Sequence, residues 1–479
     1  MSRLTVNYFY NAALTVSSYA INLILFPYVA RVLGVDGLGQ TGFVSDCVHY
    51  FVIFAVLGIA TVGTREIAAC GDNMEKRSAV FSSLTSLLMI TTGIVLTVYL
   101  LSCFFLPRFC QNQELFLIGT AMLLSQSFVI EWFFQGIENF RYITIRALAI
   151  KLLYVVAVFL FVKSKGDVVM YFALTALMLL SNTVVNLWCS RRYVRFSFRL
   201  ASIGKFLKPV LLVGAYAVMV SMYTSFTAIF LGFVADDAEQ GAYQAAKKLL
   251  YLILGAFTAF TAVMFPRISS LLAEEKHDEY NNKIAHSFEL VFAVAIPIVI
   301  YVEVFAVDII RILSGPEFGS AVLPLRIVMP VLLLSAMAQI WIMQVLFPMR
   351  KDWVVLTGSV IGAICAICLC LLLIRPYGAV GTAIALLLSE VLANSFGLVY
   401  ALSKGLLRFP LSLFARSLLY CLPYLVLCLA VYFACPVLWL RLVLSLFLCA
   451  CWFVINHFVI NRNSFIARQG LGLLKHYHF

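Results

Sequence analysis

The chain has 479 residues, of which 63% are hydrophobic and only 12% are charged. Soluble proteins carry about 25% charged residues, so this composition excludes a large soluble enzyme and is typical of a protein that crosses a membrane many times. The formal charge of +12 comes from basic residues scattered between apolar runs, which argues against a nucleic-acid-binding patch.

Apolar segments follow one another along the whole chain, each near the length of roughly 20 residues that a helix needs to span the hydrocarbon core. The first is longer than the apolar core of a signal peptide, so we expect it to be a spanning helix. We predict an all-α polytopic membrane protein of about 14 transmembrane helices. Their expected ranges are 5–30, 40–64, 79–102, 113–135, 145–162, 168–188, 209–233, 243–265, 284–307, 321–347, 353–374, 379–402, 414–434 and 437–459.

An internal repeat relates the first two predicted helices to the seventh and eighth. Gly39 and Gly241 each open a helix, Arg65 and Arg267 each follow a helix end, and both pairs are 202 residues apart. An even number of spans separates the copies, so they have the same orientation. We therefore predict two pseudo-symmetric six-helix bundles, 1–195 and 196–405, with a binding site between them. A C-terminal helix pair and a tail follow at 406–479.

Lysine and arginine concentrate in alternate loops, which is the pattern that retains a loop in the cytoplasm. This distribution places both termini in the cytoplasm. The most basic connection, 189–208, is interpreted as a topology anchor that contacts anionic lipid headgroups.

Motifs for catalysis and nucleotide binding are missing from the sequence. It contains no phosphate-binding loop, no H-E-x-x-H zinc motif and no G-x-S-x-G nucleophile motif. Most cysteines lie within apolar segments, and Cys365 and Cys368 lack the second ligand pair of a zinc site. We expect no catalytic residue, no metal site and no cofactor, apart from a proton or Na⁺ as a coupling ion.

Glu390 is the most deeply placed carboxylate. It lies 11 residues into the segment that begins at residue 379, about 16 Å along a helix. Asn394 follows one turn later on the same face. A carboxyl group at this depth is carried neutral and releases its proton on contact with water, which suits ion coupling or gating. The structural alternative is a protonated Glu390 that is hydrogen-bonded to a neighbouring helix.

Asp46 matches the lysine pair Lys247 and Lys248 in the internal repeat. An ion pair between the two halves would hold the outer side closed until a substrate anion displaced the carboxylate. The alternative is a static salt bridge, or lysines that reach to the membrane interface. A further lysine, Lys151, lies near the inner end of the segment predicted at 145–162.

Arginine and hydroxyl-bearing residues supply the remaining candidates. Arg31, Arg65 and Arg267 lie at helix ends, where they either anchor the interface or ring a vestibule that attracts phosphate. The polar faces of the first and seventh helices either line a wet cavity that bonds sugar hydroxyls or hold helices together. Their candidate residues are Ser18, Asn22, Tyr223 and Ser225.

Four stretches together resemble a known family. They are Arg31-Val-Leu-Gly34-Val-Asp-Gly-Leu-Gly39, Thr64-Arg65-Glu66-Ile67-Ala68, Glu131-Trp132-Phe-Phe-Gln135-Gly136-Ile-Glu138 and Phe265-Pro266-Arg267-Ile-Ser269. In this order they are similar to the Wzx-type O-antigen and polysaccharide flippases. These form the polysaccharide transport branch of the multidrug/oligosaccharidyl-lipid/polysaccharide (MOP) exporter superfamily, which also holds the MATE transporters and the peptidoglycan lipid flippases. The resemblance covers the first twelve predicted helices.

The resemblance implies a secondary-type transporter rather than an enzyme. It would move an undecaprenyl-diphosphate-linked oligosaccharide, such as an O-antigen or capsule repeat unit, from the cytoplasmic to the periplasmic leaflet of a bacterial inner membrane. It further implies alternating access around a cationic cavity, coupling to an ion gradient, and glycan polymerase or assembly proteins as partners. The peptidoglycan flippases carry arginines within the first helix, whereas residues 2–30 hold only Arg3 here, which argues against a peptidoglycan role.

Two other functions remain open at this point. A multidrug or cation antiporter of the same fold would need an acidic cavity, and Lys151, Lys247 and Lys248 count against it. A membrane enzyme acting on the same lipid carrier would need an extramembrane catalytic surface, and the loops between the predicted helices are short.

Overall fold

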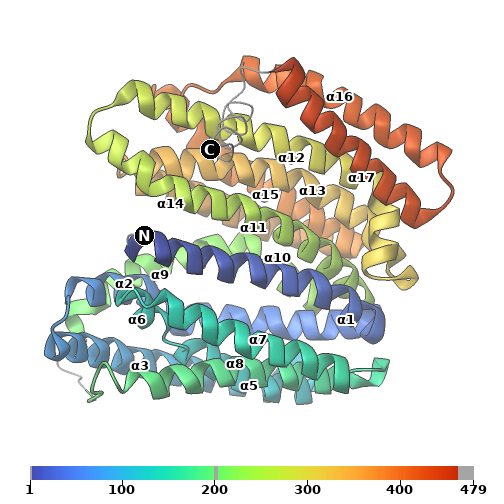
Figure 1. Ribbon diagram of the computed structural model, residues 1–479. Helices are drawn as coiled ribbons and strands as arrows, with labels where there is room; N and C mark the ends of the chain where they lie inside the picture. Colours follow the sequence, from blue (N-terminus) through green and yellow to red (C-terminus); the bar gives the residue numbers. More distant parts are fainter. Residues whose placement is uncertain (1–2, 199–202, 462–479) are drawn as a thin grey trace. The chain divides into compact units, whose positions relative to one another are not determined.

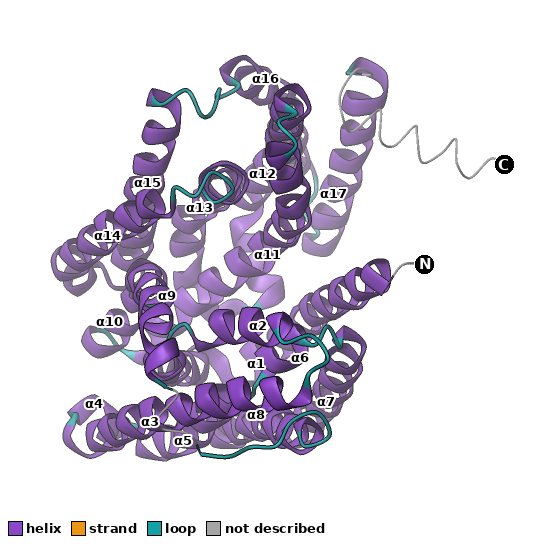
Figure 2. Cartoon of the chain, turned by 90° about the vertical axis from the view of Figure 1, so that its left-hand side faces the viewer, coloured by secondary structure: helices purple, strands orange, loops and turns teal. Residues whose placement is uncertain are grey.

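The computed structural model describes residues 3–198 and 203–461, and within this part of the chain helices are joined by loops, without strands (Figure 2). In chain order its elements are α1 (Arg3–Val56), α2 (Ile59–Ala69), α3 (Met74–Phe105), α4 (Pro107–Gln111), α5 (Gln113–Phe128), α6 (Glu131–Gly136), α7 (Phe140–Phe161), η1 (Lys165–Asp167), α8 (Val168–Ser190), α9 (Gly204–Thr224), α10 (Phe226–Val234), α11 (Asp237–Ala273), α12 (His277–Leu313), η2 (Pro316–Ala321), α13 (Val322–Gln339), η3 (Ile340–Leu346), α14 (Asp352–Leu369), η4 (Cys370–Ile374), α15 (Arg375–Ser403), α16 (Leu411–Ala434), α17 (Leu438–Val454) and η5 (Ile455–Ile460). Residues 462–479, which belong to the tail predicted to be cytoplasmic, lie outside the described residues.

Twelve helical runs within the described residues are long and apolar enough to cross a membrane. Two of them, Ala13–Val56 with 44 residues and Asp352–Ser403 with 52, are each long enough for two crossings. Each is interrupted by a glycine with a positive φ, Gly34 at 73° and Gly378 at 51°. Counted in this way, the spans agree with the fourteen predicted from the sequence, and the all-α polytopic class is confirmed.

Two of the predicted spans are broken helices. The run predicted at 40–64 ends as a helix at Val56, and α2 begins only after Leu57, whose φ is 46°. The run predicted at 113–135 breaks before α6 at Ile130, whose φ is 42° and whose side chain is fully buried. A left-handed backbone at a branched residue costs about 1–2 kcal/mol, so the surrounding packing must hold it in place.

The chain forms two compact units. The N-terminal unit comprises Met1–Gln244 with Ala366–Thr382, and the C-terminal unit comprises Ala245–Cys365 with Ala383–Phe479. This division differs from the predicted lobes in assigning residues 204–244 to the N-terminal unit. The boundaries predicted at 195 and 405 stay a prediction about the internal repeat.

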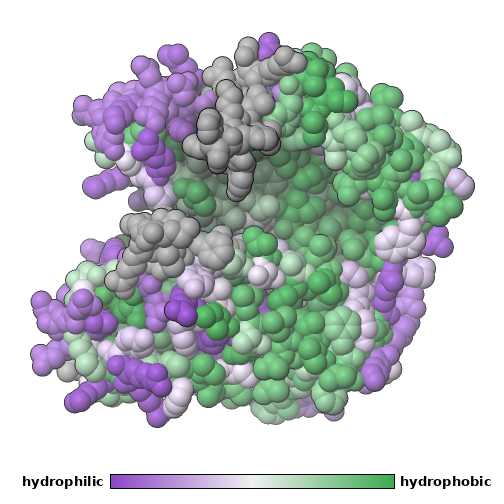
Figure 3. Space-filling view, in the orientation of Figure 1, coloured by the Kyte–Doolittle hydropathy of each residue, from purple (hydrophilic) through white to green (hydrophobic). Residues whose placement is uncertain are grey.

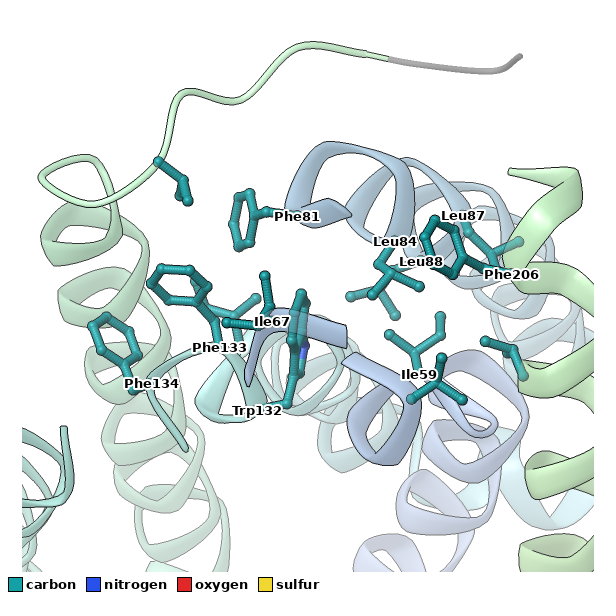
Figure 4. Close-up of a cluster of buried hydrophobic side chains, with 14 of the residues drawn as sticks. Ile59, Ile67, Phe81, Leu84, Leu87, Leu88, Trp132, Phe133, Phe134 and Phe206 are labelled. Carbon is teal, nitrogen blue, oxygen red and sulfur yellow. The ribbon is translucent and has the colours of Figure 1, made fainter. Parts of the chain in front are cut away.

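In the N-terminal unit, α1, α5, α7 and α8 pack side by side (Figure 1). An aromatic cluster at the end where α2 and α6 meet joins Phe81, Trp132 and Phe133 to Ile67 (Figure 4). A Cβ at Gly63 would overlap the ring of Trp132, so this glycine allows α2 to approach α6 closely. Two of the four stretches that carry the family resemblance, 64–68 and 131–138, therefore form one packed corner of this unit.

In the C-terminal unit, α12 packs against both α13 and α16. Phe288 and Phe292 on α12 contact the rings of Phe409 and Phe414, which lie at the beginning of the C-terminal helix pair. Near the other end of that pair, Arg441 donates to the Asp308 carboxylate at 2.8 Å. These contacts attach α16 and α17 to α12.

Many large apolar side chains are exposed along the helices, among them Phe105, Leu153 and Phe433, which are 77%, 71% and 82% exposed. In Figure 3, hydrophobic residues cover the middle lengths of the helices, and hydrophilic residues gather at their ends. A surface of this kind is stable against lipid tails and not against water. The protein is therefore a multi-pass membrane protein.

Candidate functional site

A cavity of about 610 Å³ lies inside the N-terminal unit, between α1, α2, α5, α6, α7, α8 and α9. Its polar lining includes Ser18, Gln126, Glu131, Gln135, Lys151 and Asn182. Both helix breaks also contribute to its wall, because Leu57 and Ile130 line it. Broken helices at membrane depth are tolerated where they are buried in protein or line a cavity, and they commonly surround transport sites.

Lys151 and Ser18, both candidates from the sequence, lie together in this cavity. The Nζ of Lys151 donates to the Ser18 hydroxyl at 2.7 Å, and that hydroxyl donates to the Leu14 carbonyl at 2.7 Å. Lys151 is half-buried and makes no ion pair within the part of the chain that the structure describes. The cavity therefore holds an ammonium group whose hydrogen-bond partner is neutral.

The depth of Lys151 differs from the sequence expectation. The segment predicted at 145–162 placed it near one helix end, whereas α7 starts at Phe140, so that Lys151 lies near the midpoint of its 22 residues. The reason is a helix cap: the Asn139 side chain accepts a hydrogen bond from the Tyr142 N–H at 3.4 Å. A lysine near the middle of a spanning helix is expensive, which marks it as a functional candidate.

A buried network beside the cavity escaped the sequence analysis. The Arg146 guanidinium donates to Glu131 and to Asn186, and only 4% of the Arg146 side chain is exposed. Asn186 also donates to the Val129 carbonyl at 2.5 Å, at the break between α5 and α6. In the sequence, the sign of this network was the pair Asn182 and Asn186, which lie one turn apart within an otherwise apolar helix. Glu131 is paired with Arg146, and Lys151 is the one lysine or arginine among the described residues that line the cavity.

The three candidate arginines are exposed, and Arg65 and Arg267 each contact an acidic residue. Arg65 contacts Glu66 at 3.2 Å, and Arg267 contacts Glu279 at 2.8 Å. Arg31 lies exposed on α1, outside the cavity lining. A vestibule that includes these arginines stays a prediction.

The loop between α11 and α12, next to Arg267, carries a further acid–base pair. Lys276 donates to the Glu274 carboxylate at 2.6 Å, and this hydrogen bond lowers the pKa of Glu274 below its ordinary value. With Glu275 the loop holds two carboxylates and one ammonium group, so it adds no surplus of positive charge beside Arg267.

Asp46 accepts a hydrogen bond from the Gln244 amide at 2.6 Å. Gln244 lies one turn before Lys248 on α11, and both Lys247 and Lys248 belong to the C-terminal unit. The predicted ion pair between Asp46 and Lys248 stays a prediction.

A second polar cluster in the N-terminal unit was not predicted. Arg108 contacts the Asp237 carboxylate at 2.5 Å and donates through Nε to the Gly232 carbonyl at 2.8 Å. The Gln40 amide donates to the other oxygen of Asp237 at 3.0 Å. Sequence separations of more than 120 residues hide this cluster from any local pattern. It fixes the first turn of α11 to α4 and α1.

The remaining hydroxyl and amide candidates are dispersed. Asn22 is exposed on α1, and Tyr223 is buried on α9. Ser225 lies at the junction of α9 and α10, where its N–H bonds the Ser221 carbonyl. None of the three lines the cavity around Lys151.

Glu390 and Asn394 are both buried in the C-terminal unit, 8% and 9% exposed. The Asn394 amide donates to the Glu390 carboxylate at 2.6 Å and to the Glu390 backbone carbonyl at 2.9 Å. The predicted pairing of these two side chains on one face of a helix is thus present. Whether they couple an ion stays a prediction.

Comparisons with known proteins agree with one another. The family described as polysaccharide biosynthesis protein matches residues 4–272, which is more than half of the chain. A protein of Escherichia coli (strain K12) named "Putative O-antigen transporter" is 23% identical over 419 residues, covering 84% of this chain and 97% of that protein. A protein of the same name from Shigella dysenteriae is 24% identical over 387 residues, covering 79% of this chain and 95% of that protein.

Solved structures share the fold. The structure entitled "Lipid II flippase MurJ, inward closed conformation" superposes with a TM-score of 0.75 at 15% identity, covering 94% of this chain and 98% of that one. An inward-facing multidrug resistance MATE family transporter of the MOP superfamily gives a TM-score of 0.62 at 14% identity, covering 80% of this chain and 93% of that one. At these identities the likeness concerns the fold alone.

Proposed function

This chain belongs to the polysaccharide biosynthesis protein family, and on that premise we propose that it is a flippase for an undecaprenyl-diphosphate-linked oligosaccharide. It moves this lipid, an O-antigen or capsule repeat unit or a similar glycan, from the cytoplasmic to the periplasmic leaflet of a bacterial inner membrane. Both termini lie in the cytoplasm, and a proton or Na⁺ gradient drives alternating access. The chemistry is transport, without a bond made or broken.

The observation that carries the proposal is Lys151, an ammonium group near the middle of a spanning helix and open to a cavity of about 610 Å³. Burying an uncompensated diphosphate in hydrocarbon costs far more than thermal energy, so a flippase must offer cations along the path. Within the described residues Lys151 donates to a neutral hydroxyl, that of Ser18, and a phosphate oxygen can replace this hydroxyl with a stronger, charge-assisted bond.

The neutral polar groups of the same cavity suit the glycan. Gln126, Gln135 and Asn182 supply amide donors and acceptors, which are the partners that sugar hydroxyls use. The exposed arginines Arg31, Arg65 and Arg267 would collect the anionic headgroup near the membrane surface, and Lys247 and Lys248 would extend the cationic path. The prenyl chain would remain in lipid, so only the headgroup needs the cavity.

A cation antiporter of the same fold is less well supported by this cavity. Such a protein needs a carboxylate that is available to the substrate, and the carboxylate here, Glu131, is paired with Arg146. The structure thus favours an anionic substrate headgroup.

The test is a flipping assay in proteoliposomes. A fluorescent undecaprenyl-diphosphate-linked oligosaccharide is incorporated, and its transfer between leaflets is followed by quenching from outside. We expect Lys151→Ala to slow transfer about tenfold or more, the loss of one charge-assisted hydrogen bond, and Lys151→Arg to retain part of it. The matched control is Lys163→Ala, which removes an exposed lysine just beyond the end of the same helix. Equal rates in Lys151→Ala and Lys163→Ala would contradict the proposal.

A further inference from the structure

A second cavity, in the C-terminal unit, has no part in the transport route described above. It has a volume of about 390 Å³ and lies between α12, α16 and η5, the π-helical end of the last helix. Its polar lining includes Glu289, Arg416, Tyr420, Tyr424, Asn456 and His457. This concentration of hydrogen-bonding groups is unusual for a helix pair whose other surfaces are apolar.

The wall of this cavity contains buried polar atoms that lack a partner. Within the described residues, neither His457 Nδ1 nor the Tyr424 hydroxyl has a hydrogen bond, although the two side chains are only 7% and 3% exposed. Buried polar groups are normally satisfied, and leaving one unsatisfied costs about 1–3 kcal/mol. A group bound in the cavity would satisfy both of these atoms.

The π-helix explains why these residues face the cavity. In η5 the Asn461 N–H bonds the Asn456 carbonyl, five residues earlier, at 2.8 Å. This wider turn is irregular, and such turns occur frequently at functional sites. The Asn461 amide also donates to the Asn456 side chain at 2.9 Å, which holds that side chain in place at the wall.

The charges of the cavity select its ligand. Arg416 makes no ion pair within the described part of the chain, so its guanidinium is available to an anion. Arginine matches phosphate oxygens well, because its N–H groups form a planar fork. Glu289 places a carboxylate in the same lining, which disfavours a multiply charged anion. One cation and one carboxylate therefore fit a singly charged phosphodiester better than a diphosphate.

The position of the cavity indicates a lipid. Arg416 is the sixth residue of α16, about 8 Å from its start, and the whole helix of 24 residues is about 36 Å long, longer than a hydrocarbon core of about 30 Å. Arg416 therefore lies about 5 Å inside the end of the hydrocarbon core, from where its long side chain can reach the headgroups. The cavity itself has an apolar edge, because Val459 and Ile460 line it and are 56% and 51% exposed. Acyl chains attached to a headgroup in the cavity can leave it along these two side chains.

From these observations we propose that the cavity between α12, α16 and η5 binds the phosphodiester headgroup of a membrane phospholipid. Arg416 holds the phosphate, His457 and Tyr424 hydrogen-bond to the headgroup, and the acyl chains leave the cavity along Val459 and Ile460. The site is independent of the transported glycan, and a bound lipid would join the C-terminal helix pair to α12.

Native mass spectrometry of the full-length purified protein tests this site. Phosphatidylglycerol, phosphatidylethanolamine, uncharged diacylglycerol and undecaprenyl diphosphate are offered separately, together with inorganic phosphate. We expect both phospholipids to be retained, and diacylglycerol and inorganic phosphate to be lost. Arg416→Ala lowers phospholipid retention about tenfold or more, and Arg416→Lys lowers it less.

The matched control is Arg408→Ala, because Arg408 is also exposed and precedes the same helix. It should retain phospholipid as the parent does. His457→Phe keeps an aromatic ring against Phe453, whose centroid lies 4.6 Å away, and should lower retention several-fold without unfolding the helix pair.

Three outcomes would overturn the assignment. Equal retention by the Arg416→Ala and Arg408→Ala variants would remove Arg416 from the site. Equal retention of diacylglycerol and phosphatidylglycerol would show that acyl chains alone bind. Tighter, Arg416-dependent retention of undecaprenyl diphosphate than of either phospholipid would assign the cavity to the glycan carrier. Lys151→Ala, by contrast, should keep its phospholipid, which separates this site from the transport proposal.

Discussion

Gly39 and Gly241 face each other where α1 crosses the start of α11. A Cβ added to Gly39 would overlap the Asp237 carbonyl and approach the Gly241 nitrogen, and a Cβ added to Gly241 would overlap the Val35 carbonyl. These two glycines hold equivalent positions in the internal repeat predicted from the sequence, and both lie in the N-terminal unit. The close contact therefore joins two residues that the predicted repeat relates by 202 positions.

Alanine at either glycine should destabilise the protein, because the added methyl groups force two backbones apart. Overpacking of this kind costs about 1–3 kcal/mol. The measurement is the thermal unfolding midpoint in detergent. Gly93→Ala is the matched control, since no atom of another part lies within 4 Å of a Cβ there, and it should leave the midpoint unchanged or raise it slightly. Equal midpoints for Gly39→Ala and Gly93→Ala would show that the crossing is loose.

The contact between Arg108 and Asp237 should be a measurable contributor to stability. Both side chains are largely buried, 21% and 20% exposed, and Gln40 bonds the same carboxylate. A double-mutant cycle of Arg108→Ala and Asp237→Ala should give a coupling free energy of about 1–3 kcal/mol. The exposed pair Arg65 and Glu66 is the control and should give less than about 1 kcal/mol. A coupling no larger than that of the control would argue against the structural role of Arg108.

Arg146 should be among the least replaceable residues of the N-terminal unit. Arg146→Met leaves the Glu131 carboxylate without its cation and the Asn186 oxygen without its donor, and because Glu131 is 37% exposed we expect a loss of about 1–3 kcal/mol. Chemical unfolding followed by tryptophan fluorescence measures the effect, with Trp132 next to the network as reporter. Arg141→Met, an exposed arginine on the same helix, should change stability by less than about 0.5 kcal/mol. Comparable losses in both variants would refute the network.

Glu390→Gln should separate ion coupling from folding. Glutamine retains an oxygen that can accept the hydrogen bond from Asn394, so the unfolding midpoint should change little. It removes the ionisable group, so gradient-driven transport should be lost if Glu390 carries the coupling ion. Transport is measured in proteoliposomes with and without a pH difference, and Glu114→Gln, an exposed carboxylate on α5, is the control. Transport that responds to the gradient as in the parent would exclude Glu390 from coupling.

The sequence was sufficient for the number of spans, because a bilayer demands long apolar helices and hydropathy reports them directly. The helix breaks at Leu57 and Ile130 were hidden, since the apolar pattern continues through both. Ile130 has neither glycine nor proline beside it, and only tertiary packing can hold its backbone left-handed. Asn139 is a residue type that commonly caps helices, so the sequence alone could have predicted that α7 starts there. Lys151 would then have been expected near the middle of that helix.

The polar networks were predictable only in part. Glu390 and Asn394 are one turn apart on one helix, and local spacing was enough to pair them. Arg146 and Asn186 come from different helices, as do Arg108 and Asp237, and one sequence contains no information on which helices pack together. Lys151 is a candidate from the sequence because of its charge, and Ser18 because it lies on a polar helix face. Their shared cavity is a property of the folded chain.

The two broken helices also bear on how this protein tolerates sequence change. Part of the cavity wall is formed at Leu57 and Ile130, where the main chain leaves its helical path. Peptide groups are chemically identical whatever side chain they carry, so this part of the wall depends on the packing that holds the two breaks and not on which polar side chains line the cavity. Substitutions of lining side chains such as Gln126 and Asn182 should therefore change the hydrogen-bonding groups of the cavity while leaving both helix breaks in place.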